Sequence, residues 1–72
     1  MSAKPLSFMR EDVTNLLTEK GITSADKAIS VADVMAELNL GKADVHVTEA
    51  TMDFLRRQGI FEATADKKYF LK

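Results

Sequence analysis

The side chains with the clearest chemical potential are charged, and most of them lie in the second half of the chain. Four cations form two adjacent pairs: Arg56-Arg57 and Lys67-Lys68. Three acids precede them along the sequence: Asp44, Glu49 and Asp53. Residues 44–53 contain no Lys or Arg, so the net charge of −1 is an average over an acidic stretch and a basic one. Adjacent Arg and Lys side chains can bind anionic groups such as phosphate through charge-assisted hydrogen bonds.

The residue types present argue against metal binding, a phosphate-binding loop and catalysis. The chain has no cysteine and one histidine, His46, with Asp44 two residues away as a weak candidate ligand. A zinc site needs more ligands than that. The three glycines are scattered, which argues against a Gly-rich phosphate loop, and no spacing of Ser, His and Asp supports a catalytic triad. We therefore expect no metal, no cofactor and no enzyme activity.

Length and hydropathy place these residues in one small domain. A chain of 72 residues suffices for one domain, and 46% hydrophobic residues are normal for a globular protein. No apolar run approaches the roughly 18 residues of a membrane span, and the N-terminus lacks a signal-like apolar stretch. The sequence therefore predicts a cytoplasmic protein with no membrane partner. Because no disulfide is available, the hydrophobic core must stabilise the fold.

The first helix is predicted over residues 8–20, after a flexible N-terminal arm at residues 1–6. Ser7 can cap it, because its hydroxyl can accept a hydrogen bond from an otherwise unpaired backbone N–H. One apolar stripe is formed by side chains at helical spacing: Met9, Val13, Leu16 and Leu17. Gly21 is expected to end the helix in the left-handed conformation, with Ile22 packing back on the last turn.

The second helix is predicted over residues 31–39. Ser30 followed by Asp33 is similar to a capping box, in which side chains and backbone N–H groups bond reciprocally. Residues 23–29 then form a connector in which Ile29 makes a short strand-like contact, although they could instead begin a longer second helix. Two residues could end the helix: Asn39 or Gly41.

The third helix is predicted over residues 49–58, with Thr48 as its cap and Asp44 as a competing start one turn earlier. Its core seam is expected at two side chains: Met52 and Leu55. Gly59 provides a second left-handed stop after the helix. A polar link at residues 40–47 therefore joins the second and third helices.

Beyond Gly59 the sequence pattern changes from helix to strand. Residues 60–63 and 68–71 are typical of two strands, joined by a polar turn at residues 64–67. A lone hairpin is marginally stable in water, so this one must lie on the helices. Three side chains are expected to face them: Ile60, Tyr69 and Leu71. Two aromatic side chains then lie on the other face, either as an exposed contact surface or as a small second core with Leu6 or Phe8: Phe61 and Phe70.

This order of elements, with three stretches of sequence, resembles the winged helix-turn-helix superfamily. The stretches are residues 29–38 (ISVADVMAEL), 54–62 (FLRRQGIFE) and 66–71 (DKKYFL). They are similar to the second helix, the step from recognition helix into wing, and the returning wing strand. The resemblance spans residues 7–72 and implies a single, mainly helical α+β domain. In that domain three helices are followed by a two-stranded β-hairpin wing.

The resemblance also implies a function, that of a small DNA-binding protein and transcriptional regulator acting as a dimer on double-stranded DNA. The third helix would enter the major groove, and the wing would reach the backbone or the minor groove. The implied base-facing residues are His46, Thr48, Glu49, Thr51 and Asp53. The implied phosphate-binding residues are Lys42, Arg56, Arg57, Lys67 and Lys68.

Two features depart from the superfamily's pattern. The link from Leu40 to Thr48 is longer than the usual tight turn, so the third helix could begin earlier. The acids of the third helix would repel phosphates, and each lost phosphate contact weakens binding at every sequence. A second hypothesis is therefore a protein interaction module or small adaptor subunit, docking through the acidic third helix or the Phe61/Phe70 face. A homodimeric structural module is the third.

Overall fold

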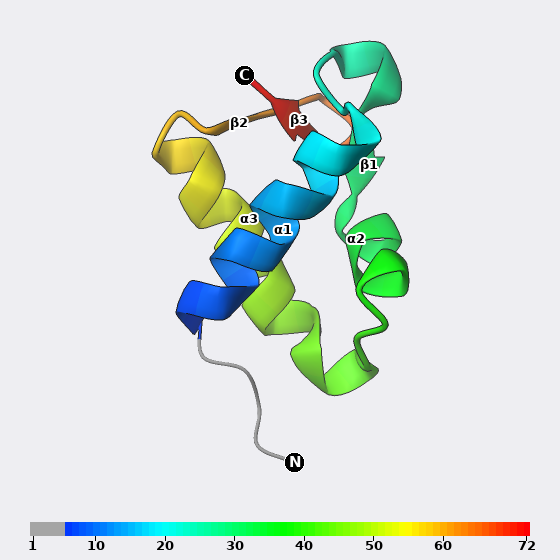
Figure 1. Ribbon diagram of the computed structural model, residues 1–72, viewed down its shortest axis with the longest axis vertical. Helices are drawn as coiled ribbons and strands as arrows, with labels where there is room; N and C mark the ends of the chain where they lie inside the picture. The colour runs from blue at the N-terminus through cyan, green and yellow to red at the C-terminus, as the bar shows by residue number, and fades with distance from the viewer. Residues whose placement is uncertain (1–5) are drawn as a thin grey trace.

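The computed structural model describes the backbone of residues 6–72 and the side chains of residues 9–72 (Figure 1). Within that range the chain forms three α-helices: α1 (Leu6–Lys20), α2 (Val31–Glu37) and α3 (Val45–Arg57). It also forms three strands: β1 (Ile29–Ser30), β2 (Phe61–Ala63) and β3 (Lys68–Leu71). Two short 3₁₀ turns precede β1 and α3: η1 (Ala25–Lys27) and η2 (Lys42–Asp44). The predicted α+β, mainly helical class is confirmed.

The helix ends follow one pattern. Each of the three described helices is followed, within two residues, by a residue with positive φ: Gly21, Asn39 and Gly59. In each case the N–H of the residue after the positive-φ one donates to a carbonyl five residues earlier: Ile22 to Leu17 (3.0 Å), Leu40 to Met35 (2.9 Å) and Ile60 to Leu55 (3.0 Å). This is the Schellman arrangement, which satisfies the last unpaired carbonyls. The stops predicted at Gly21 and Gly59 are confirmed, and Asn39 rather than Gly41 ends α2.

The helix starts agree with the sequence at α2 and differ from it at the other two helices. The Ser30 hydroxyl accepts from the N–H of Asp33 (3.2 Å), and the Asp33 carboxylate accepts from the N–H of Ser30 (3.1 Å), so the capping box is confirmed. The predicted cap at Ser7 is wrong, because α1 already begins at Leu6, which also shortens the expected arm. Residues 1–5 of that arm lie outside the described range.

The third helix begins four residues earlier than its predicted start. Asp44 occupies the N-cap position of α3, so the competing start is the correct one. The predicted cap at Thr48 is wrong, because Thr48 lies one full turn inside the helix. The turn η2 brings the chain directly into α3, and the link after α2 is correspondingly shorter than expected.

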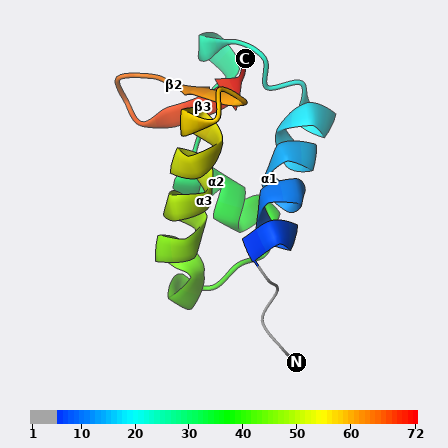
Figure 2. The ribbon, with the colours of Figure 1, turned by 90° about the vertical axis from the view of Figure 1, so that its left-hand side faces the viewer.

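The strands form one antiparallel sheet in the order β1-β3-β2. Ile29 of β1 pairs with Tyr69 of β3, which confirms the short strand-like contact expected at Ile29. Helices α1 and α3 lie side by side, and the β2–β3 hairpin crosses the C-terminal end of α3 (Figure 2). The sheet therefore covers one end of the helical layer.

The hairpin register differs by one residue from a symmetric four-residue turn at residues 64–67. The N–H of Thr64 donates to the carbonyl of Lys68 (2.8 Å), and the N–H of Lys67 donates to the carbonyl of Thr64 (3.0 Å). Lys67 has φ 62, so the loop is a tight turn followed by a left-handed residue. Phe61 is consequently opposite Leu71 and not opposite Phe70.

This register overturns the predicted Phe61/Phe70 face. A shift of one residue moves a strand's side chains to the opposite face. Phe61 is 1% exposed and belongs to the core, whereas Ile60, expected to face the helices, is 41% exposed. Phe70 is half-buried and packs against the core. The alternative in which these rings meet Leu6 or Phe8 involves side chains outside the described ones.

The core draws on every helix and on the hairpin. Its buried members are Met9, Val13 and Leu17 of α1, Ile22, Val34 of α2, Met52 and Leu55 of α3, and Phe61 of β2. The apolar stripe predicted for α1 is confirmed, although Leu16 is only partly buried at its edge. The seam predicted at Met52 and Leu55 is confirmed as well.

Candidate functional site

A shallow groove separates the exposed side of α3 from the β2–β3 hairpin. Its wall on α3 is charged: Glu49, Asp53 and Arg56. The hairpin wall carries both polar and charged side chains: Ala63, Thr64, Asp66, Lys67 and Tyr69. The end of β1 and the start of α2 close one side: Ser30, Val31 and Ala32. Both signs of charge are therefore mixed within one concave surface.

Asp53 binds both arginines of the basic pair that ends α3. Its Oδ1 accepts from Arg56 Nη2 at 2.7 Å and from Arg56 Nε at 3.2 Å. Its Oδ2 lies 2.7 Å from Arg57 Nη2. These are i,i+3 and i,i+4 pairs on one helix, a spacing at which side chains are neighbours. The three groups form one unit, called here the Asp53 triad, with a net charge of +1.

Hydrogen bonding and charge within the triad reinforce its ionisation. The hydrogen bond from Arg56 is the main cause that lowers the pKa of Asp53 below its usual value, and the charge of Arg57 lowers it further. The same hydrogen bond raises the pKa of Arg56. Both shifts favour the charged forms of Asp53 and Arg56, and Asp53 offsets part of the positive charge that the arginines present.

The predicted phosphate-binding residues divide into two groups in space. Arg56 and Lys67 line the same groove, although strand β2 lies between them in the sequence. Lys68 is exposed on β3 next to this end. Lys42 lies in η2, at the other end of α3, about 20 Å away by helix length. The cations thus flank α3 at both of its ends.

The predicted base-facing residues also divide, here by burial. His46 and Glu49 are exposed on the first turns of α3, where His46 Nδ1 lies 3.6 Å from Glu49 Oε1. Asp53 lies in the groove and belongs to the triad. Thr48 and Thr51 are instead buried, at 0% and 2% exposure, so the expectation that they face bases is wrong.

The buried threonines have a clear local cause. The Thr48 hydroxyl donates to the Asp44 carbonyl (2.8 Å), and the Thr51 hydroxyl donates to the Val47 carbonyl (2.7 Å), which satisfies both groups inside the protein. One signal in the sequence indicated this burial. The core face of α3 is a helical i, i+3, i+4, i+7 pattern once threonine is counted with the apolar residues: Thr48, Thr51, Met52 and Leu55.

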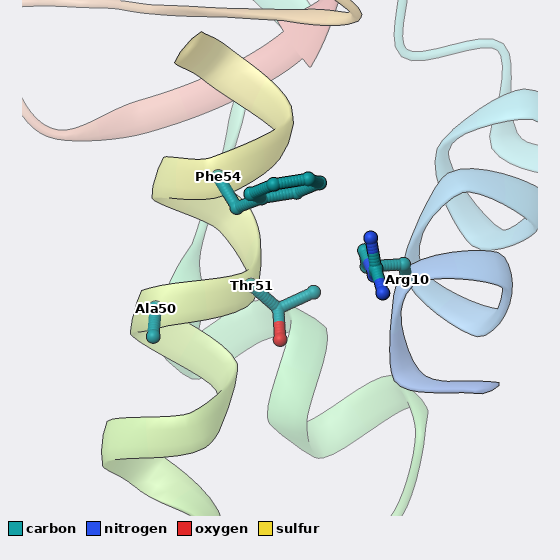
Figure 3. A pocket seen from close by; sticks show the side chains of 4 residues that line it. All are labelled: Arg10, Ala50, Thr51 and Phe54. Atoms are coloured by element: carbon teal, nitrogen blue, oxygen red, sulfur yellow. The ribbon is translucent and has the colours of Figure 1, made fainter. Parts of the chain in front are cut away.

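A second surface feature was not anticipated. The Arg10 guanidinium carbon lies 4.7 Å from the centroid of the Phe54 ring, in a cation–π contact between α1 and α3 (Figure 3). Small hollows on either side of Phe54 are lined also by Ala50, Thr51 and Ile60. Among the described residues, the large hydrophobic side chains that remain most exposed lie along this flank: Val47, Phe54 and Ile60. We call them the α3 apolar strip.

Other kinds of site are not indicated by the described part of the chain. In residues 6–72 no cluster of three or more His, Cys, Asp or Glu side chains could hold a metal ion. Over the same range, no helix has both the length and the hydropathy that crossing a bilayer requires. Comparison of the chain with protein-family models, with curated proteins and with solved structures returned no match.

Proposed function

We propose that this chain is a winged helix-turn-helix domain that binds double-stranded DNA and acts as a transcriptional regulator. The observation that carries the proposal is the element order, helix, strand, two helices and a hairpin, with β1 paired to β3 at the edge of the sheet. In this arrangement α3 corresponds to the recognition helix and the β2–β3 hairpin to the wing. The observed topology keeps the order of elements on which the sequence resemblance depends, and this agreement supports the proposal.

The placement of exposed cations supports the same function. Lys42 lies at the start of α3, the two arginines lie at its end, and Lys67 and Lys68 lie on the hairpin. Phosphate groups flank a major groove on both sides, so cations at both ends of a recognition helix suit a helix inserted between them. Of the residues that the resemblance implies to face bases, His46 and Glu49 are exposed on α3, and Asp53 lines the groove beside them.

The acids of α3 predict weak binding to DNA. The contacts between cations and phosphates predict that this binding weakens as salt concentration rises. Each phosphate contacted releases counterions, so the logarithm of the association constant falls with the logarithm of salt concentration by about 0.9 per contact. We would measure fluorescence anisotropy of a labelled duplex at about 50 and 200 mM salt. Binding at the lower concentration that weakens sharply at the higher one is the expected result. No binding at the lower concentration, or no salt dependence, would contradict the proposal.

A matched pair of variants locates the contact. Lys67→Ala is expected to weaken binding and to reduce the salt slope by about 1. Lys20→Ala removes the same charge from α1, where Lys20 pairs with Glu37 at 3.1 Å, and should leave the slope unchanged. Equal effects of the two variants would mean that the hairpin is not part of the DNA interface.

A specific observation favours one second candidate, a protein interface. In the α3 apolar strip, Val47 and Phe54 are seven residues apart and so lie on the same side of α3, and Ile60 lines a hollow together with Phe54. Exposed apolar patches with polar rims are typical of protein contacts. We take a second copy of this chain as the partner, because Arg10 and Glu11 border the strip with opposite charges. In a two-fold symmetric dimer, Arg10 of one copy could then face Glu11 of the other. Sedimentation equilibrium would show a mass that rises with concentration for the wild type and remains monomeric for Phe54→Lys.

A further inference from the structure

We propose that Asp53 orients Arg56 to bind a guanine base, so that this pair determines sequence specificity at one position of the DNA site. The inference rests on the proposed DNA-binding function and assigns a role to one ion pair within it. It goes beyond the general expectation that Arg56 contacts phosphate. The evidence lies in which donors of Arg56 are occupied and which are left.

The hydrogen bonds to Asp53 occupy one edge of the Arg56 guanidinium. Nε and Nη2 both donate to Oδ1 of Asp53, at 3.2 and 2.7 Å. A guanidinium has five N–H donors in a rigid plane. The adjacent edge, formed by one N–H of Nη1 and the second N–H of Nη2, has no acceptor among the described residues. Three N–H donors therefore remain, and two of them, one on each Nη nitrogen, are parallel in a plane that the carboxylate restricts.

Two parallel donors match the major-groove edge of guanine. Guanine presents two adjacent acceptors there, O6 and N7, and a bidentate arginine is the commonest specific contact to them. The groove beside Arg56 is open to solvent, and the Arg56 side chain is 43% exposed, so a ligand can reach this edge. Arg57 makes a single bond to Asp53 and is more exposed, which suits a less directional contact to phosphate.

The position of the carboxylate favours a base over a phosphate as the partner of Arg56. A negative charge close to the DNA backbone weakens binding to every sequence alike. Arginine can bind phosphate bidentately too, but a tetrahedral phosphate presents pairs of oxygens in several planes, so a fixed guanidinium plane matters less there. A bidentate base contact needs a fixed plane, and Asp53 provides one. Asp53 thus lowers affinity for all DNA while it raises the preference for one base.

The test compares charge-matched variants on duplexes with a randomised centre, by enrichment and sequencing of the bound fraction. Asp53→Ala and Asp66→Ala each remove one negative charge from the same groove, but Asp66 has no ion pair with any described residue. The wild type is expected to enrich guanine at one position. Asp53→Ala should lose that preference by about 10-fold while binding non-specific DNA at least as well. Asp66→Ala should keep the preference.

Two further variants separate a positioning role from a merely structural one. Asp53→Asn keeps an oxygen that accepts from Arg56 and should restore part of the preference that Asp53→Ala loses. Arg56→Lys lacks the planar fork and should lose the guanine preference with a smaller change at other sequences. Circular dichroism of each variant is the control for retention of the helices.

Several outcomes would overturn the inference. One is a guanine preference that survives Asp53→Ala, and another is an Arg56→Lys variant that weakens all sequences equally, which would make Arg56 a phosphate contact. A wild type that binds duplexes without any base preference would overturn this inference and leave DNA binding itself intact. A wild type that binds no duplex at low salt would overturn the proposed function first.

Discussion

At the scale of single residues, Asp53 is the group whose ionisation matters most. Its bonds to Arg56 and Arg57 lower its pKa in the folded state. A carboxyl group with a depressed folded pKa contributes stability above its unfolded pKa, near 3.9, and loses that contribution as pH falls through the folded value. The triad therefore stabilises the fold at neutral pH and not in strong acid.

We expect the stability difference between the wild type and Asp53→Asn to depend on pH in that direction. The wild type should be more stable at neutral pH, and its advantage should shrink as pH falls below about 4. Because the side chains are largely solvent-accessible, the advantage is small. Urea denaturation at a series of pH values measures it. An advantage that grows in acid would show that the ion pairs do not stabilise the folded state.

Lys67 is a second residue whose backbone conformation affects the stability of the fold. Its φ of 62 places an L-residue in the left-handed region, which is unfavourable by about 1 kcal/mol. Lys67→Gly should therefore raise the free energy of unfolding by about 0.5–1 kcal/mol, since glycine adopts this conformation freely. Lys68→Gly removes the same charge one residue later, within β3, and should lower stability instead. Equal effects of the two would contradict the assigned turn.

At the scale of elements, the hairpin register decides which aromatic residue enters the core. Phe61 pairs with Leu71 and is buried, whereas Ile60 is 41% exposed. Phe61→Ala should cost about 3–5 kcal/mol, as expected for removal of a buried aromatic ring. Ile60→Ala should lower the free energy of unfolding by about 1 kcal/mol or less, since the Ile60 side chain is partly exposed and its truncation removes less buried apolar area. Denaturant titration followed by circular dichroism measures both, and a larger loss for Ile60→Ala would contradict the register.

Helix boundaries were predictable where residues close in sequence supply the hydrogen-bond partners of the terminal backbone groups. The Ser30–Asp33 capping box and the left-handed stops at Gly21 and Gly59 depend on residues a few positions apart. The start of α3 was not decided by the sequence in this way, because Thr48 and Asp44 both suit a cap. Burial of the Thr48 face against α1 and α2 favours the earlier start, and that burial is a tertiary effect.

At the scale of the whole molecule, one core joins all the helices to the hairpin. Val13, Met52 and Phe61 belong to different elements and to the same buried cluster. The domain should therefore unfold in a single cooperative step. Tyr69 is the one tyrosine of a chain without tryptophan, so its fluorescence reports on the sheet while circular dichroism reports on the helices. The two urea transitions should coincide, and separate midpoints would show that the sheet unfolds independently.

The sequence by itself determined the class of fold, the positions of the helices and strands to within a few residues, and the separation of acidic from basic charge. These follow from hydrophobic periodicity and from caps made by near neighbours. Only the tertiary structure decided two matters: the burial of Thr48 and Thr51, and the face of Phe61. Each depends on helix phase, strand register or side-chain direction, where a shift of one residue moves a side chain from solvent to core. The candidate site differs from its predicted form for that reason, because such a shift leaves the hydrophobic pattern almost unchanged.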